Sequence, residues 1–174
     1  MQRRAITERV QANKPRGSIN TGDEPGAILS ERKTILSGQL AIIAAALFSG
    51  AAVYINVAEQ PARLGLADQP LLDEWKPAYK RGTIMQAPLT VLGFLLGAWA
   101  WWQTDNLLWA TGGLCMLANL PVTLLGILPT NNRLMATATA TNESRVLIVK
   151  WGALHAIRTT LGFAGTASFL FASL

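Results

Sequence analysis

The sequence predicts an all-α integral membrane protein, a four-helix bundle with up-down topology. Apolar residues make up 51% of the 174 residues and charged residues only 14%, against about 25% charged residues in a typical soluble domain. The stretches 35–57, 84–104 and 107–132 contain no Asp, Glu, Lys or Arg. Because about 20 apolar helical residues cross a bilayer, each stretch can span one. This layout excludes a soluble nucleic-acid-binding protein, despite the net charge of +5.

Residues 1–33 differ in composition from the rest of the chain, and we predict that they form a disordered basic tail. They hold seven of the fifteen Lys and Arg residues and show no helical periodicity. The tail is either a plain extension or a segment that contacts anionic lipid headgroups. Residues 34–174 are predicted to form the transmembrane domain.

Four transmembrane helices are predicted, at about residues 35–57, 84–102, 107–129 and 146–174. The four residues between the second and third helices impose an antiparallel hairpin, and tryptophans flank it as in an aromatic belt: Trp99, Trp101, Trp102 and Trp109. The last helix carries polar residues only near its start, so its remainder can span by itself.

The longer connection between the first two helices is predicted to contain an amphipathic interfacial helix. Leu71, Leu72, Trp75 and Tyr79 recur at helical spacing among charged residues. Such a helix lies on the bilayer surface or caps the bundle.

Up-down topology brings the polar residues of both long connections to one end of the bundle. The ends of the first and third helices meet the starts of the second and fourth there. The residues gathered at this end are Glu59, Trp75, Tyr79, Arg81, Asn131, Trp151, His155 and Arg158. Lys and Arg counts on the two sides nearly cancel, so the orientation in the membrane stays open.

Small residues predict close helix packing. Gly93 and Gly97 form a GxxxG pair, which serves packing inside the chain or a homodimer. The single cysteine, Cys115, lies in an apolar run and has no disulfide partner in the chain.

His155 and Arg158 are the main candidates for chemistry. They are three residues apart and share one helix face. Ionisable residues inside a membrane helix are costly and therefore candidates for function, although Arg158 could also snorkel to the headgroups. Glu59 could pair with Arg158 or with Arg63. One histidine and one distant cysteine cannot build a metal site, so no metal is expected.

Several motifs in order resemble the anthrone-oxygenase-like family of small four-helix membrane proteins. They are Glu-Gln-Pro-Ala-Arg at 59–63, Trp-Lys-Pro-x-Tyr-Lys-Arg-Gly at 75–82, Pro-Thr-Asn-Asn-Arg-Leu at 129–134 and Trp-x-x-Leu-His-x-x-Arg at 151–158. The resemblance covers residues 35–174. It implies oxidation of a polyketide anthrone by dioxygen, without metal or flavin, so no cofactor is expected.

The residues suit such a reaction. His155 is the side chain that exchanges protons near neutral pH and could act as the base. Arg158 and Asn131 could stabilise an enolate oxygen. The predicted substrate-binding residues are the aromatic side chains, which could sandwich a flat lipophilic aromatic molecule, and two charged residues at the same end: Trp75, Tyr79, Trp151, Arg81 and Glu59.

A non-catalytic role remains as the alternative, in which the same polar end binds a lipid, a quinone or a partner subunit and Arg158 and Arg81 anchor an anion. A transporter has less support, because the sequence has no inverted repeat. In either main case we expect membrane lipid around the protein, in a bacterial inner (plasma) membrane. The substrate itself cannot be named from the sequence.

Overall fold

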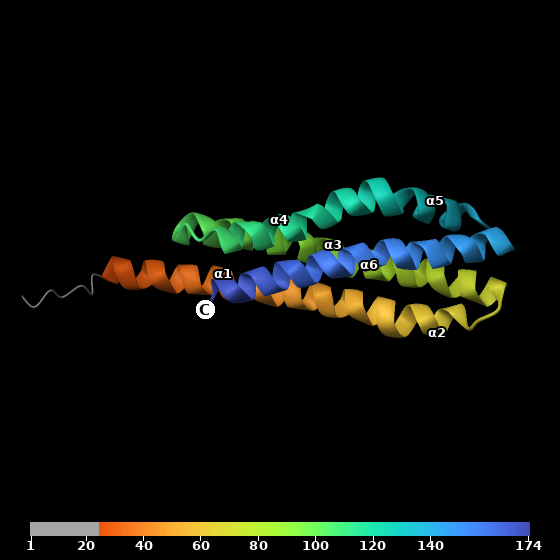
Figure 1. Ribbon diagram of the computed structural model, residues 1–174, viewed down its shortest axis with the longest axis horizontal. Coiled ribbons are helices and arrows are strands. Elements are labelled where there is room, and N and C mark those ends of the chain that lie inside the picture. The colour runs from red at the N-terminus through yellow and green to blue at the C-terminus, as the bar shows by residue number, and fades with distance from the viewer. Residues whose placement is uncertain (1–24) are drawn as a thin grey trace, which may run out of the picture. The chain divides into compact units, whose positions relative to one another are not determined.

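The computed structural model describes the backbone of residues 25–174 and the side chains of residues 36–174 (Figure 1). The predicted tail therefore lies largely outside the described residues. Its last part, from Pro25, belongs to the first helix, which begins ten residues earlier than predicted. All regular structure between residues 25 and 174 is helical. The elements in chain order are α1 (Pro25–Tyr54), η1 (Ile55–Glu59), α2 (Gln60–Leu64), α3 (Asp68–Thr104), α4 (Leu107–Pro121), η2 (Val122–Ile127), α5 (Leu128–Ala136) and α6 (Asn142–Ala172).

Three helical runs of the described chain are long and apolar enough to cross a membrane. They are Leu36–Leu64, Asp68–Thr104 and Leu107–Ala136, of 29, 37 and 30 residues. Many large apolar side chains on these runs are exposed, among them Leu47 and Leu125, as expected for surfaces that face lipid. The fourth helix, α6, does not reach the same hydropathy, although it is 31 residues long.

The segment predicted as a separate interfacial helix is the first part of α3. The helix continues without a break from Asp68 to Thr104, through Pro77 and Pro88. Leu71, Leu72 and Trp75 are fully buried, in a cluster that also includes Trp151. The apolar stripe that suggested contact with the bilayer is therefore covered by other helices of the chain, and the helix boundary predicted at residue 84 is not present.

α3 and α4 form a hairpin with a two-residue connection. Asp105 ends α3 with φ 53°, in the left-handed region, and Asn106 caps α4 by accepting a hydrogen bond from the backbone N–H of Leu108 at 3.0 Å. Aspartate and asparagine are among the few residues that adopt or cap such turns readily. The hairpin is thus tighter than the four-residue connection predicted.

α6 contacts most of the other helical elements. It packs on α3, α4, α5, η1 and η2, and it runs between the other helices in Figure 1. It also meets α1, because the Ser49 and Thr166 hydroxyls lie 3.0 Å apart. The remaining face of α6 exposes large apolar side chains, among them Ile157, Phe163 and Phe171.

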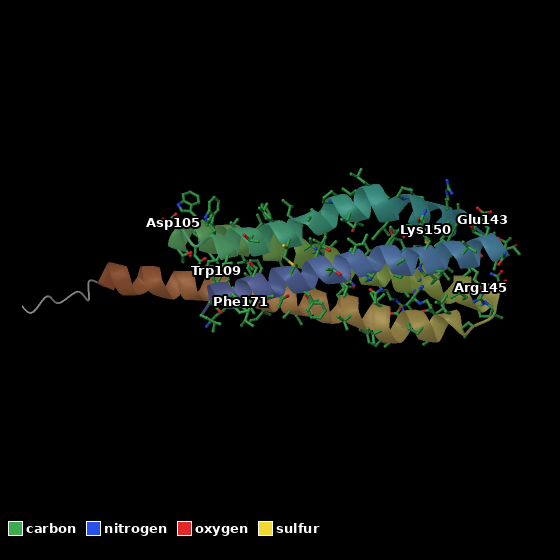
Figure 2. The ribbon with its side chains drawn as sticks, viewed as in Figure 1. Asp105, Trp109, Glu143, Arg145, Lys150 and Phe171 are labelled. Carbon is green, nitrogen blue, oxygen red and sulfur yellow. The ribbon has the colours of Figure 1, made fainter. Side chains whose placement is uncertain are left out.

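The start of α6 is fixed by charge and by a cap. Thr141 and Ser144 form a capping box, and Arg145 pairs with Asp68 and donates to the Leu64 carbonyl at 3.0 Å. Figure 2 shows Glu143 and Arg145 at one end and Asp105 and Phe171 at the other. The connection between α2 and α3 is therefore held against the start of α6.

Two π-helical segments, η1 and η2, interrupt the first and third membrane-capable runs in the same way. In each, the N–H of the residue after the segment bonds five residues back, from Gln60 to Ile55 and from Leu128 to Thr123. After each segment, one residue further on, comes a proline, Pro61 or Pro129, and a proline cannot donate a helical hydrogen bond. Such single-turn bulges widen a helix and are frequent at functional sites.

The GxxxG pair packs inside the chain. Gly93 faces Met116, and Gly97 faces the ring of Phe169 on α6. Both glycines are buried. The face that a homodimer through Gly93 and Gly97 would need is therefore covered by α4 and α6.

Gly162 of α6 lets α1 approach closely, and its replacement should destabilise the protein. A Cβ there would lie 2.8 Å from Phe48 Cδ1 and 2.9 Å from Ser49 Oγ. We expect Gly162→Leu to lower the free energy of unfolding in detergent by about 1–3 kcal/mol through overpacking. Gly50→Leu is the matched control, because nothing lies within 4 Å of a Cβ at that position. Equal unfolding transitions for the two variants would contradict this packing.

Candidate functional site

A cavity of about 200 Å³ is lined by η1, α2, α3, α4, η2, α5 and α6. Both π-helical segments contribute to its wall, η1 through Ile55 and Glu59 and η2 through Thr123 and Ile127. Its polar lining comes from different elements: Glu59, Arg63, Tyr79, Thr83, Gln86, Thr90, Asn119, Thr123, Asn131, His155 and Arg158. The helix widening at η1 and η2 thus coincides with a hollow that has both apolar and polar walls.

The structure brings the three predicted catalytic residues to this one cavity. His155 and Arg158 come from α6, and Asn131 comes from α5. His155 and Asn131 are each 1% exposed. Of the predicted substrate-binding residues, Tyr79, Trp151 and Glu59 also line the cavity.

Two predicted substrate-binding residues do not line the cavity. Trp75 is fully buried behind Tyr79, on which it stacks with ring centroids 5.1 Å apart. Arg81 is exposed. Both residues were predicted at the same end of the bundle as His155. The rotation of α3 about its axis decides which of its side chains face the cavity. Tyr79 does so, whereas Arg81, two residues later, points elsewhere.

His155 is held by a hydrogen bond from one ring nitrogen to the end of the first membrane-capable run. Its Nδ1 lies 2.8 Å from Asn56 Oδ1. The Asn56 amide nitrogen donates to the Gly152 carbonyl at 3.0 Å, which fixes the amide oxygen toward the imidazole. Thr159 donates to the same oxygen at 2.8 Å. An amide oxygen can only accept, so Nδ1 carries the proton.

This arrangement leaves Nε2 as the basic nitrogen of a neutral imidazole. Of the two ring nitrogens of His155, only Nδ1 has a hydrogen-bond partner among residues 36–174. The ring lines the cavity. The site therefore presents a fixed proton acceptor to whatever occupies the hollow, in the way that other bases are oriented by a third group.

A continuous row of rings, from His155 through Trp151 and Trp75 to Tyr79, forms part of the cavity wall and backs it. Trp151 stacks on His155 with centroids 5.0 Å apart. Trp75 meets Trp151 edge to face at 5.7 Å and stacks on Tyr79. The rings fix one another, and the imidazole has an aromatic face on the side of Trp151.

A buried ion-pair network flanks these rings. The Arg63 side chain is 2% exposed and pairs with Glu59 and, at 3.1 Å, with Glu74. Its guanidinium carbon also lies 5.8 Å from the Trp151 ring centroid. Of the two pairings that the sequence allowed for Glu59, the structure contains the one with Arg63.

Arg158 is placed differently. Its guanidinium carbon lies 5.4 Å from the Phe48 ring centroid, and the ion pairs found among residues 36–174 do not include it. Its Nε has no hydrogen-bond partner among these residues. A cation without a carboxylate beside it favours an anion or a developing negative charge in the cavity.

Sequence analysis missed Asn56 as the partner of His155, and it missed Gln86 and Asn119 in the cavity wall. The latter two are each 1% exposed. The sequence does contain a signal for them. Each is an amide inside a long apolar run, where a polar side chain is costly and therefore indicates a functional role. No group of three or more His, Cys, Asp or Glu residues that could hold a metal occurs in the described part of the chain.

Arg63 should be essential for the stability of this wall. Arg63→Leu leaves Glu59 and Glu74 facing each other without a cation, and we expect a loss of about 1–3 kcal/mol, because both carboxylates keep some access to water. Thermal unfolding in detergent measures it. Adding Glu59→Gln and Glu74→Gln to Arg63→Leu should recover most of the loss. A triple variant no better than the single one would contradict the charge argument.

Comparisons with known proteins agree with the resemblance noted in the sequence. An anthrone oxygenase of Claviceps purpurea is 28% identical, over 72% of this chain and 82% of the relative. Anthrone oxygenase tpcL of Aspergillus fumigatus is 30% identical, over 76% of this chain and 89% of the relative. No solved structure matches the chain. Both relatives are fungal, so the expected bacterial membrane finds no support. Residues 75–168 match the family described as anthrone oxygenase, and the chain belongs to that family.

Proposed function

We propose that the protein is a membrane-embedded oxygenase that oxidises a lipophilic aromatic substrate in the cavity, using dioxygen and no cofactor. The observation that carries the proposal is the hydrogen bond between His155 Nδ1 and Asn56 Oδ1 at 2.8 Å, which leaves Nε2 as a base at a closed-in site. The names of the fungal relatives support an anthrone as the substrate class.

In the proposed membrane arrangement α6 is a fourth span, and the four runs cross the bilayer up and down. Two features support this. The outer faces of the other runs expose large apolar side chains such as Leu36, Leu47 and Leu125. The polar side of α6, with His155 and Thr166, faces other helices of the chain. A substrate soluble in lipid can then reach the cavity from the bilayer.

The first proposed step is removal of a proton from a CH₂ group conjugated with a carbonyl. His155 Nε2 takes the proton, and the C–H electron pair moves through the rings onto the carbonyl oxygen. Arg158, which has no ion-pair partner among the described residues, and the Asn131 amide face the negative oxygen as donors. Donors that are already in place lower the barrier most where water is excluded.

The second step is the reaction of this electron-rich carbon with dioxygen. One electron passes from the enolate to dioxygen, and the resulting radicals combine into a carbon–oxygen bond. The peroxide takes the proton held by His155 and becomes a hydroperoxide. Loss of the remaining C–H proton and of hydroxide, which together make water, leaves a carbonyl. In sum, CH₂ and O₂ give C=O and H₂O, so dioxygen takes up all four electrons.

His155→Ala should abolish the base without disturbing substrate entry. We expect oxygen consumption by the purified protein with an anthrone to fall by about 10²- to 10⁴-fold, the usual contribution of a positioned general base. Lys150→Ala is the control, because Lys150 is exposed on the same helix. Rates equal to wild type after His155→Ala would remove the mechanism. If the wild-type protein bound the anthrone without oxidising it, the non-catalytic alternative would be favoured instead.

Asn56 should act as a positioning residue, through His155. Asn56→Leu removes the acceptor that holds the Nδ1 proton, so the imidazole can take the wrong tautomer. We expect kcat to fall at least about tenfold with little change in KM. Asn56→Asp keeps an oxygen acceptor at this place and should recover much of kcat. An equal fall in kcat for both variants, or a change in KM alone, would contradict the role of Asn56 in orienting the base.

A further inference from the structure

Two amide side chains in the cavity wall have no role in the proposed chemistry. Gln86 comes from α3 and Asn119 from α4, and each is 1% exposed. Both line the cavity. Neither the nitrogen nor the oxygen of the Gln86 amide has a hydrogen-bond partner among residues 36–174, and the same holds for the Asn119 oxygen. Asn131 is unpartnered too, but the proposed reaction already gives it a role.

Packing between helices does not account for these amides. Elsewhere in the described chain amides bond across helices: Asn56 donates to the Gly152 carbonyl at 3.0 Å, and Gln60, whose oxygen is unpartnered, donates to the Ile148 carbonyl at 2.9 Å. The Asn119 nitrogen bonds only within its own helix, to the carbonyls of Cys115 and Met116. Leaving a buried polar group unpaired is costly, so the free atoms of Gln86 and Asn119 indicate a polar partner inside the cavity.

The free atoms also define the chemistry of that partner. Gln86 offers one NH₂ group and one oxygen, whereas Asn119 offers only an oxygen. Two acceptor oxygens need donors from the ligand. A carbonyl, an ether or a quinone oxygen cannot donate, and a cation has no reason to prefer neutral amides to the carboxylate of Glu59 in the same wall. A hydroxyl group both donates and accepts, and so satisfies this set.

We propose that Gln86 and Asn119 form a subsite that binds the hydroxyl groups of a phenolic ring system. The proposal rests on the proposed function for the aromatic nature of the ligand, and it adds that the ligand carries free hydroxyls. An aromatic ligand whose hydroxyls are methylated leaves both amide oxygens unpaired. The subsite therefore selects a hydroxylated ring over its methyl ether.

Binding of a hydroxylated anthraquinone and of its methyl ether tests the subsite apart from any oxidation, because the central carbons of an anthraquinone already carry oxygen. Affinity for the full chain in detergent is measured by quenching of tryptophan fluorescence. We expect the hydroxylated compound to bind about tenfold or more tightly than the ether. Equal affinities would overturn the proposal, since they would mean that water satisfies the amides.

The variants Gln86→Leu and Asn119→Leu complete the test. Each should weaken binding of the hydroxylated compound by about tenfold and leave binding of the ether unchanged, which also shows that the cavity stays open. Because these amides lack protein partners, neither variant should lower the melting temperature of the ligand-free protein. Asn56→Leu, which removes an amide with partners, should lower it. Unchanged binding of the hydroxylated compound, or a melting temperature as low as that of Asn56→Leu, would overturn the subsite. If the unaltered protein bound the hydroxylated compound more tightly than the ether but did not oxidise an anthrone, only the proposed function would be contradicted.

Discussion

The contact between Asn56 and His155 is the interaction on which the rest of the site depends. It joins the end of the first membrane-capable run to α6, and it passes directly through the candidate base. The Gly152 carbonyl fixes the direction of the amide, and Thr159 supports its oxygen. A polar link of this kind between helices is worth most where water cannot compete. The same bond thus contributes to packing and sets the chemical state of the imidazole.

The cavity exists because the helices around it are irregular at matching places. The π-helical segments η1 and η2 both end just before a proline, and both contribute to the cavity wall. Away from the cavity, small residues allow close packing, because Gly97 and Gly112 make room for the ring of Phe169. The cavity thus lies between two tightly packed regions, one around Phe169 and one that contains the fully buried Leu71, Leu72 and Trp75.

Much of the fold could be predicted from residue types alone, because charge-free runs and short connections leave few choices. The all-helical class, the membrane-capable runs and the hairpin before α4 follow in this way. The continuation of α3 from Asp68 could not be predicted, since Leu71, Leu72 and Trp75 show the same spacing whether they face lipid or other helices. The π-helical segments leave no periodic signal either, because a single bulge shifts the pattern by only one residue.

The sequence predicts that certain polar residues lie near one another, but not how they are connected. Connectivity brings His155, Arg158 and Asn131 to one end of a bundle. Which amide fixes the imidazole depends on the rotation of two helices about their axes, so Asn56 could not be singled out. The same limit explains why Trp75 and Arg81 were expected in the cavity wall and lie outside it.

The state of the imidazole nitrogens tests the central claim directly. His155 is the single histidine of the chain, so protein labelled with ¹⁵N-histidine and purified with a histidine-free tag gives one imidazole to observe. The account predicts, for the ligand-free protein in detergent at neutral pH, a protonated Nδ1 and an unprotonated Nε2. Asn56→Leu should abolish this preference. A proton on Nε2 in the unaltered protein, with Nδ1 free, would contradict the account.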